Sequence, residues 1–373
     1  MIKVGITGSA GFIGQHLYNA LGVCPDEFEI VPFNKDFFSN TSILAEFAAK
    51  CDVIVHLAAM NRHNNPDIIY NTNIGLVKQL IDALEQVNSK AHVLFSSSSQ
   101  EERDNIYGKS KKEGRELFAE WAKHSGGKFT GLVIPNVFGP FGNPYYNSFI
   151  ATFCHQLAHN EQPKIEVDGL VKLIYVGDLV KQIIAEIRSK SENHLFAIAA
   201  TDEYRVTEIL NLLERYKREY MDDGIIPQLN NSFETNLFNT FRCYMDIRHH
   251  FPVKFTKHTD LRGSFVEVVR LNVGGQVSFS TTVPGITRGN HFHTRKIERF
   301  AVIKGDALIQ LRRIGTDEVL NFYLSGDAPA YVDMPIWYTH NIKNTGEDDL
   351  YTIFWINEFY DPKDPDTYFE NVN

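Results

Sequence analysis

The sequence predicts two domains in series, an α/β domain with a parallel sheet over residues 1–245 and an all-β domain over residues 246–373. The chain has 373 residues, which suits two domains of about 100 to 200 residues each. In its first half, short apolar runs alternate with helix-like stretches, the pattern of βαβ units. After about Tyr244, short alternating runs separated by Gly, Pro, Asn and Asp indicate antiparallel strands.

Four short apolar runs in the first half predict the strands of the parallel sheet, at residues 3–7, 28–33, 53–58 and 93–97. In the second half, residues 263–269 and 300–304 read as strands of the all-β domain. The boundary falls in residues 246–254, a stretch that holds Pro252 and has no helical period. The fold is therefore expected to change class at this point.

Composition and charge exclude several classes of protein. Hydrophobic residues make up 43% of the chain, enough to bury a core, so a disordered chain is excluded. The net charge of −9 lacks the basic footprint of a nucleic-acid binder. No apolar run reaches the roughly 18 residues of a membrane span, and the amino-terminal residues lack a signal-peptide layout. We expect a cytoplasmic protein that binds neither nucleic acid nor membrane.

Three glycines follow the first predicted strand directly, and an amphipathic stretch at residues 16–21 follows them. Gly8, Gly11 and Gly14 let the turn approach a pyrophosphate closely, and the next helix offers its amino-terminal amides to the anion. The alternative is an ordinary tight turn. The place of this turn in an alternating βα pattern favours a dinucleotide site, to which Phe12 and Ile13 also belong.

The glycine spacing G-x-x-G-x-x-G, together with Tyr107 and Lys111 in a Y-x-x-x-K pattern, resembles the extended short-chain dehydrogenase/reductase family. This resemblance implies a Rossmann-type fold and a nicotinamide cofactor. The two side chains lie one helical turn apart, a spacing that is also typical of an ordinary solvated helix face. In the functional interpretation, the lysine ammonium lowers the tyrosine pKa, and the phenol passes a proton to a carbonyl oxygen while the cofactor delivers hydride.

The same resemblance assigns further site residues. Ser98, or else Ser97, hydrogen-bonds the substrate carbonyl, although this polar run also suits a plain strand-to-loop transition. Cofactor contacts are expected at Leu57, Ala58, Ala59 and Asn73, and substrate contacts at Asn136 and Asn147.

The end of the second predicted strand indicates which nicotinamide cofactor is preferred. A dehydrogenase that selects NAD usually carries Asp or Glu there, to bind the ribose 2′-hydroxyl. This chain has Asn34 and Lys35 instead, and a cation without a carboxylate suits a 2′-phosphate. We therefore predict NADPH, although Asp36 lies close enough to oppose this choice.

A second set of motifs lies in the all-β domain. Gly285, His291, His293, Glu298 and Gly305 follow the order G-x5-H-x-H-x4-E-x6-G, which resembles the first motif of the cupin family, a double-stranded β-helix or jelly-roll fold. A second cupin motif is matched by Pro335, His340 and Asn344, with Trp337 in place of its glycine.

The candidate metal ligands are His291, His293, Glu298 and His340. Strand alternation puts the first two on one face, and the other two are expected to converge on them from neighbouring strands. Three imidazoles and one carboxylate suit zinc, iron, manganese or nickel, and zinc is the ion we expect.

The order of the two domains resembles a family of bifunctional capsule-sugar enzymes, as do residues 146–153, 285–291 and 364–369. This resemblance implies a homodimer that acts on a UDP-linked 4-keto-6-deoxy-N-acetylhexosamine. The cupin domain is expected to epimerise carbon 3, and the reductase domain to reduce the carbon 4 ketone with NADPH. The product would be UDP-2-acetamido-2,6-dideoxy-L-talose, on the route to UDP-N-acetyl-L-fucosamine. Epimerisation comes first, because the hydrogen on carbon 3 is acidic only while its neighbour is a ketone.

Three alternatives stay open at this point. The chain is a reductase whose cupin domain serves only dimerisation and binding, or its cupin domain is an iron oxygenase, since three His and one Glu also serve that chemistry. The third alternative is a non-catalytic dinucleotide sensor, which the intact Tyr107 and Lys111 disfavour.

Overall fold

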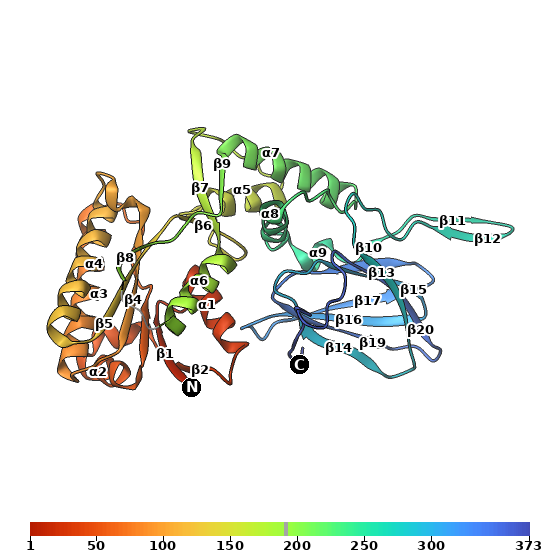
Figure 1. Cartoon of the computed structure of the whole chain (residues 1–373). Coiled ribbons are helices and arrows are strands. Elements are labelled where there is room, and N and C mark those ends of the chain that lie inside the picture. Colours follow the sequence, from red (N-terminus) through yellow and green to blue (C-terminus); the bar gives the residue numbers. More distant parts are fainter. Residues whose placement is uncertain (190–192) are drawn as a thin grey trace. The chain divides into compact units, whose positions relative to one another are not determined.

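The computed structural model describes residues 1–189 and 193–373. Its contacts group into two compact units (Figure 1). Met1–Thr152 and Val167–Val206 form the first, here called the α/β unit, and Phe153–Glu166 and Thr207–Asn373 form the second, called the β unit. Residues 207–245 thus group with the β strands, whereas the sequence analysis assigns them to the first domain. The division at residues 245 and 246 stays a prediction.

A six-stranded parallel sheet forms the centre of the α/β unit, with the order β2-β1-β3-β4-β5-β8. Its strands are β1 (Ile2–Thr7), β2 (Phe28–Val31), β3 (Val53–His56), β4 (His92–Ser98), β5 (Lys128–Ile134) and β8 (Asn193–Ala197). The four strands expected from the sequence are confirmed, because apolar runs buried on both faces mark parallel strands clearly.

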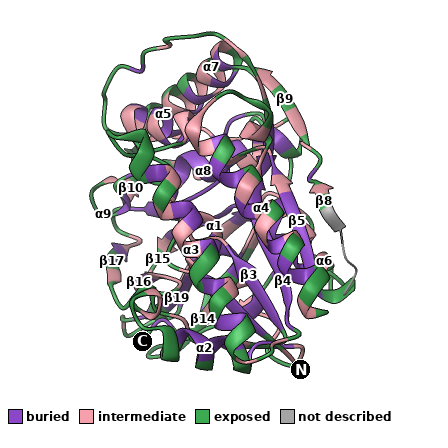
Figure 2. Ribbon diagram, turned by 90° about the vertical axis from the view of Figure 1, so that its left-hand side faces the viewer, coloured by how far each residue is buried: buried purple, intermediate pink, exposed green. Residues whose placement is uncertain are grey.

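Helices cover both faces of this sheet, since neighbouring strand residues point to opposite sides. Val93 and Phe95 of β4 pack in one apolar core with α2 (Thr41–Lys50), α3 (Pro66–Gln86) and α4 (Ile106–Ser125). Leu94 packs in the other core with α1 (Phe12–Gly22) and α6 (Val176–Ser189). Figure 2 shows β3 and β4 in the colour of buried residues. The predicted Rossmann-type α/β fold is confirmed.

Smaller elements complete the helical part of the chain. A three-stranded sheet has the order β6-β7-β9. These strands and the remaining helical segments are β6 (Asn136–Phe138), β7 (Leu170–Tyr175), β9 (Asp202–Arg205), η1 (Lys35–Ser39), η2 (Ser99–Glu102), α5 (Phe149–Ala158), α7 (Val206–Tyr216), η3 (Lys217–Asp222), α8 (Ser232–Arg242) and α9 (Ile247–His250). Among the described residues, every helix is too short or too polar to span a bilayer.

Helix α9 lies in the stretch for which the sequence shows no helical period. It has four residues, fewer than two turns, so no period can be read from it. Asp246 begins this helix, and its side chain accepts a hydrogen bond from His249 N at 3.3 Å. The absence of a helical period therefore did not exclude this short helical turn.

Two five-stranded antiparallel sheets, with the orders β10-β18-β15-β20-β13 and β17-β16-β19-β14-β21, make up most of the β unit. Their strands are β10 (Val253–Lys254), β13 (Gln276–Thr282), β14 (Thr287–Phe292), β15 (Glu298–Lys304), β16 (Asp306–Arg313), β17 (Val319–Ser325), β18 (Ala330–Met334), β19 (Tyr338–Asn344), β20 (Leu350–Ile356) and β21 (Tyr368–Phe369), and β11 (Lys257–Asp260) with β12 (Gly263–Val266) forms a separate hairpin.

The two sheets share one apolar core, to which Val302 and Val332 of one sheet and Ile309 and Ile342 of the other contribute. Two sheets that face each other across a common core form a β-sandwich. The predicted all-β fold is confirmed, and its arrangement is consistent with a cupin-like domain.

Candidate active site and metal centre

The glycine loop between β1 and α1 admits only glycine at two of its positions. Gly8 has φ +78°, and a Cβ there would lie 2.8 Å from Ala58 N. A Cβ on Gly14 would lie 2.2 Å from Gly8 O. Gly11 begins helix α1 without a side-chain cap, so the first amides of the helix face the loop, as an anion site requires.

A cavity of about 590 Å³ opens at the carboxyl ends of β1, β3 and β4. In a parallel α/β sheet this edge is where ligands bind. The predicted residues that line it are Gly8, Gly11, Phe12, Ile13, Gly14, Leu57, Ala58, Ala59, Ser97, Ser98, Tyr107, Lys111, Asn136 and Asn147. The fold thus brings the glycine loop, the Tyr/Lys pair and both predicted substrate asparagines to one cavity.

Lys111 is 3% exposed and lies beneath the cavity wall on α4. Its Nζ donates to the backbone oxygen of Ser96 at 2.7 Å and lies 5.8 Å from the centre of the Tyr107 ring. Burial lowers the pKa of Lys111 to about 7, which the charge of Glu101 partly offsets. This lysine is therefore a partly protonated group near neutral pH.

Tyr107 does not follow the expectation for its pKa. Burial, together with Tyr146, raises the pKa of Tyr107 to about 12, whereas a lysine-activated phenol has a lowered value. The physical reason is that burial penalises the phenolate, and that Lys111 directs its ammonium to Ser96 O.

Ser97 and Ser98 both line the cavity but have different partners. The Ser97 hydroxyl donates to Glu101 Oε1, and Arg115 Nη2 contacts the other oxygen of that carboxylate at 2.9 Å. The Ser98 hydroxyl oxygen accepts from Gln100 N at 3.2 Å. The Ser97 hydroxyl hydrogen is thus already bonded to Glu101, whereas the Ser98 hydroxyl can still donate its hydrogen to a ligand.

Three predicted cofactor residues lie outside the cavity lining. Asn73 is buried and holds the loop after β3, because its Oδ1 accepts from Met60 N at 2.6 Å and its Nδ2 donates to Ser110 Oγ at 3.0 Å. Asn34 caps the short helix η1 by accepting from Asp36 N at 3.0 Å. Lys35 is exposed beside it.

Two groups at this site leave no signal in the sequence. One is the ion pair of Glu101 and Arg115, which is 8% and 14% exposed and holds Ser97. The other is Arg62, whose Nη1 donates to the backbone oxygens of Tyr145 and Tyr146 at 2.9 and 3.2 Å. The spacing of 14 residues in the first pair, and of more than 80 in the second, leaves no local pattern to find them.

The four predicted metal ligands converge inside the β unit. One nitrogen or oxygen atom from each of His291, His293, Glu298 and His340 lies within 4.8 Å of the others. His291 of β14 pairs directly with His340 of β19. Glu298 comes from β15, the next strand along the chain, which lies in the facing sheet. The expected convergence therefore takes place across the two sheets. A sandwich brings two sheets together in a way that strand spacing does not reveal.

The charges and hydrogen bonds of this cluster fit a divalent metal ion. Burial, with the neighbouring histidines, lowers the pKa of His291 to about 4, so this ring is neutral and can ligate. Burial alone would raise the pKa of Glu298, but the hydrogen bond from His293 and the neighbouring His340 ring outweigh burial and lower that pKa. The carboxylate is thus ionised, and its Oε2 lies 3.3 Å from Nε2 of each of these two rings.

His340 supplies a further observation that fits a metal. Its Nε2 is buried and lies 3.3 Å from Glu298 Oε2, but it makes no hydrogen bond of good geometry to any described residue. Its Nδ1 lies 3.2 Å from the backbone oxygen of Tyr338, which fixes the hydrogen on Nδ1. A buried ring nitrogen with a free lone pair beside a carboxylate is an unsatisfied pair of acceptors, and a bound cation would satisfy both.

Trp337 stands where the second cupin motif has glycine. Its φ is +61°, in the left-handed region that glycine adopts easily. The backbone conformation of the motif is therefore kept despite the substitution, and Trp337 N donates to His293 O at 2.8 Å.

Two family models match different parts of the chain. The chain matches the model of the NAD dependent epimerase/dehydratase family over residues 4–199. It matches the polysaccharide biosynthesis C-terminal domain over residues 258–368. The first match covers the glycine loop and the Tyr/Lys pair, and the second covers all four candidate metal ligands.

Two similar proteins match nearly the whole chain, and a third matches about a third of it. The UDP-2-acetamido-2,6-beta-L-arabino-hexul-4-ose reductase of Pseudomonas aeruginosa is 31% identical over 370 residues, 98% of each chain. The capsular polysaccharide assembling protein CapF of Staphylococcus aureus is 36% identical, with a TM-score of 0.64 over 99% of this chain and all of that one. SpsL of Bacillus subtilis, a spore coat polysaccharide biosynthesis protein, is 30% identical over 123 residues, 30% of this chain and 82% of that one. The expected resemblance to capsule-sugar enzymes is confirmed.

Proposed function

Because the chain belongs to the NAD dependent epimerase/dehydratase family, we propose that it is a sugar-nucleotide enzyme with two activities. Its substrate is a UDP-linked 4-keto-6-deoxy-N-acetylhexosamine. The α/β unit reduces the ketone at carbon 4, and the β unit epimerises carbon 3. The product is UDP-2-acetamido-2,6-dideoxy-L-talose, on the route to UDP-N-acetyl-L-fucosamine.

One observation carries the reductase assignment, namely that a single cavity is lined by the glycine loop, Ser98, Tyr107 and Lys111. The similarity to a 4-ulose reductase over 98% of the chain supports the same substrate class. The bound nicotinamide supplies hydride to carbon 4. Tyr107 donates its phenolic proton to the ketone oxygen, so that an alcohol forms, and solvent returns a proton to the phenolate.

Other residues of the cavity orient the ketone for this step. Ser98 donates its hydroxyl proton to the same oxygen, since Ser97 is engaged with Glu101. A positive charge on Lys111 favours the Tyr107 phenolate that forms after proton transfer. Asn136 and Asn147 line the cavity and bind the sugar nucleotide.

We propose NADPH as the reductant. Lys35 lies beyond the end of β2, where the cofactor ribose is expected, and a charge-assisted contact to a 2′-phosphate favours NADPH over NADH. Comparing kcat/KM for the two cofactors tests this, and a ratio near unity or below contradicts it. Lys35→Ala is expected to reduce the ratio, whereas Lys50→Ala, at the end of helix α2, leaves it unchanged.

Epimerisation is assigned to the β unit because its four buried ligands fit a divalent ion, for which we propose zinc. A Lewis acid held there would stabilise the enolate that forms when the hydrogen on carbon 3 is removed. Glu298 and the three histidines would hold the ion, since one ligand atom from each lies within 4.8 Å of the others. This step precedes reduction, because the carbon 3 hydrogen loses its acidity once carbon 4 is an alcohol.

Incubation with the UDP-4-keto sugar in deuterated water, followed by NMR, tests both activities in one experiment. Without NADPH, we expect deuterium at carbon 3. With NADPH, we expect the 4-hydroxy product that has also inverted at carbon 3. Reduction without exchange would instead favour a single-activity reductase whose β unit serves binding or dimerisation.

Two further proposals concern the protein in the cell. We propose a homodimer, which sedimentation analysis tests by the mass of the purified chain in solution. We propose the cytoplasm as its location, which follows the location of UDP-sugar substrates and is tested by fractionating the producing cell.

A further inference from the structure

The carboxyl-terminal segment, residues 361–373, lies along the candidate metal centre. Strand β21 of this segment pairs with β14, with Phe369 opposite His291. The hydroxyl of Thr339, beside His340, donates to Glu370 O. Two of the four candidate ligands therefore lie on strands that this segment contacts.

Asp366 makes the densest set of contacts in the segment. It is 2% exposed, and its carboxylate accepts from the backbone nitrogens of Thr294, Arg295 and Lys296 at 3.0 to 3.1 Å. The Thr294 hydroxyl adds a bond of 2.7 Å. These residues form the loop between β14 and β15, so the carboxylate fixes the turn that separates His293 from Glu298.

The backbone of Asp366 acts on His293 directly. Its carbonyl oxygen lies 2.5 Å from His293 Nδ1, so Nδ1 carries the hydrogen of this bond. The opposite nitrogen, Nε2, then faces Glu298 Oε2 at 3.3 Å. Second-shell acceptors of this kind set the orientation and tautomer of a metal-binding histidine.

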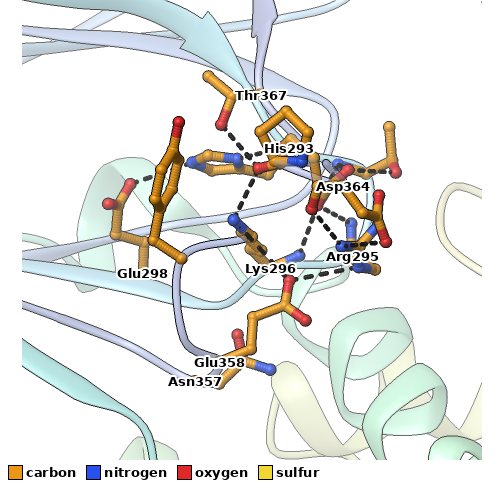
Figure 3. A network of polar contacts seen from close by, with 12 residues as sticks. His293, Arg295, Lys296, Glu298, Asn357, Glu358, Asp364 and Thr367 are labelled. Atoms are coloured by element: carbon orange, nitrogen blue, oxygen red, sulfur yellow. Dashed lines mark hydrogen bonds and ion pairs between the residues drawn. The ribbon is translucent and has the colours of Figure 1, made fainter. Parts of the chain in front are cut away.

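Neighbouring contacts fix the segment on the same loop. Arg295 Nη1 donates to Asp364 Oδ1 at 3.0 Å, and Lys296 Nζ donates to Pro365 O at 2.6 Å (Figure 3). Figure 3 shows Arg295 and Lys296 on one side of His293 and Glu298 on the other. The buried Lys296 stem and its bond leave the segment little freedom to shift.

We propose that Asp366 is a positioning residue for the metal ligand His293, and that it acts by clamping the β14–β15 loop while its carbonyl fixes the ring. This inference rests on the metal site of the proposed function. It adds a residue 73 positions away from the ligand that it orients, and it gives the carboxyl-terminal segment a role in metal affinity.

Asp366→Asn tests this proposal with little change in shape. Asp366 has φ +41°, a conformation that Asn tolerates. The new amide nitrogen cannot accept the backbone hydrogens that one carboxylate oxygen now accepts, so the loop loosens. We expect zinc affinity of the full chain, measured by competition with a chromophoric chelator, to fall by about 10- to 100-fold.

Asp361→Asn is the matched control, because it makes the same chemical change on an exposed side chain of the same segment, whose carboxylate accepts from Lys363 N within that segment. Its zinc affinity is expected to equal that of the wild type. Loading each chain with cobalt(II) adds a spectroscopic readout, since the visible absorption of the ion reports the geometry of its ligands. We expect a changed spectrum for Asp366→Asn only.

The outcomes separate this inference from the proposed function. If the wild-type chain binds no zinc, the metal site itself is refuted. If it binds zinc and Asp366→Asn binds equally well, or if both variants weaken alike, only the positioning role is overturned. If Asp366→Asn does not fold, Thr294→Val removes a single bond to the same carboxylate, and an unchanged zinc affinity in that variant overturns the role.

Discussion

Tyr107 and Lys111 lie on one face of helix α4, yet burial shifts the pKa of each away from its charged form. The phenol is thus kept protonated and ready to donate, which suits a reduction. A positive charge on Lys111 therefore stabilises Tyr107 mainly after proton transfer, when Tyr107 is a phenolate.

Tyr107→Phe removes the proton donor and keeps the ring. We expect NADPH oxidation to fall by about 10²- to 10⁴-fold, the usual range for a general acid. Deuterium exchange at carbon 3 should persist, because its chemistry belongs to the β unit. Tyr70→Phe, on helix α3, is a control of the same kind that we expect to keep full turnover. Near-normal reduction by Tyr107→Phe would remove this residue from the mechanism.

Lys111 also makes stability depend on pH. Its pKa is about 7 in the folded chain and 10.5 when exposed, so between these values the unfolded chain binds more protons. The free energy of unfolding therefore rises with pH in this window, by up to about 1.4 kcal/mol per pH unit. In Lys111→Met this contribution should vanish. Urea unfolding of the wild type and of Lys111→Met from about pH 7 to about pH 9 measures this contribution. If the free energy of unfolding changes with pH in the same way in both chains, the lowered pKa of Lys111 is contradicted.

At the residue scale, the sequence indicates which side chains belong to the site, but it does not show which partners they bind. It predicts that Ser97, Ser98 and Asn73 belong to the site. Only the fold shows that Ser97 donates to Glu101 and that Asn73 supports a loop behind the cavity wall. These distinctions depend on partners far away in the chain, which motif spacing does not encode.

At the element scale, the turn between β1 and α1 depends on close packing of backbone. A Cβ on Gly14 would come 2.2 Å from Gly8 O, so Gly14→Ala must push the helix start away from the loop. We expect the dissociation constant for NADPH, measured by fluorescence titration, to rise at least tenfold, since the anion loses its amides.

Gly22→Ala is the matched control for that loop variant, because it lies in the same helix and nothing lies within 4 Å of the added Cβ. Its affinity for NADPH should stay unchanged. Equal binding by both variants would show that the loop does not form the pyrophosphate site.

Strands with long apolar runs could be predicted from the sequence, whereas very short elements could not. The buried parallel strands have continuous apolar runs, so β1, β3 and β4 were found within about two residues of their observed ends. Helix α9 has only four residues and shows no period. The approach of Glu298 from the facing sheet follows from how two sheets stack, which is a property of the whole β unit.

At the scale of the whole molecule, the two sites belong to separate units, each with its own apolar core. Removing the metal should therefore act on one activity only. Elemental analysis is expected to find about one divalent ion per chain, and His291→Ala should lose most of it, because three ligands hold the ion less well than four. NADPH affinity should stay as in the wild type, since the glycine loop lies in the other unit.

The metal-free chain then distinguishes a catalytic ion from a structural one. If the ion stabilises the enolate, deuterium exchange at carbon 3 stops while thermal unfolding of the β unit shifts by only a few degrees. If exchange stops because the β unit melts, calorimetry shows that transition at a much lower temperature, and the ion is structural. If the metal-free chain folds, exchanges and reduces at wild-type rates, the ion has neither role. In that case His291, His293, Glu298 and His340 form a buried polar cluster without a function in the reaction.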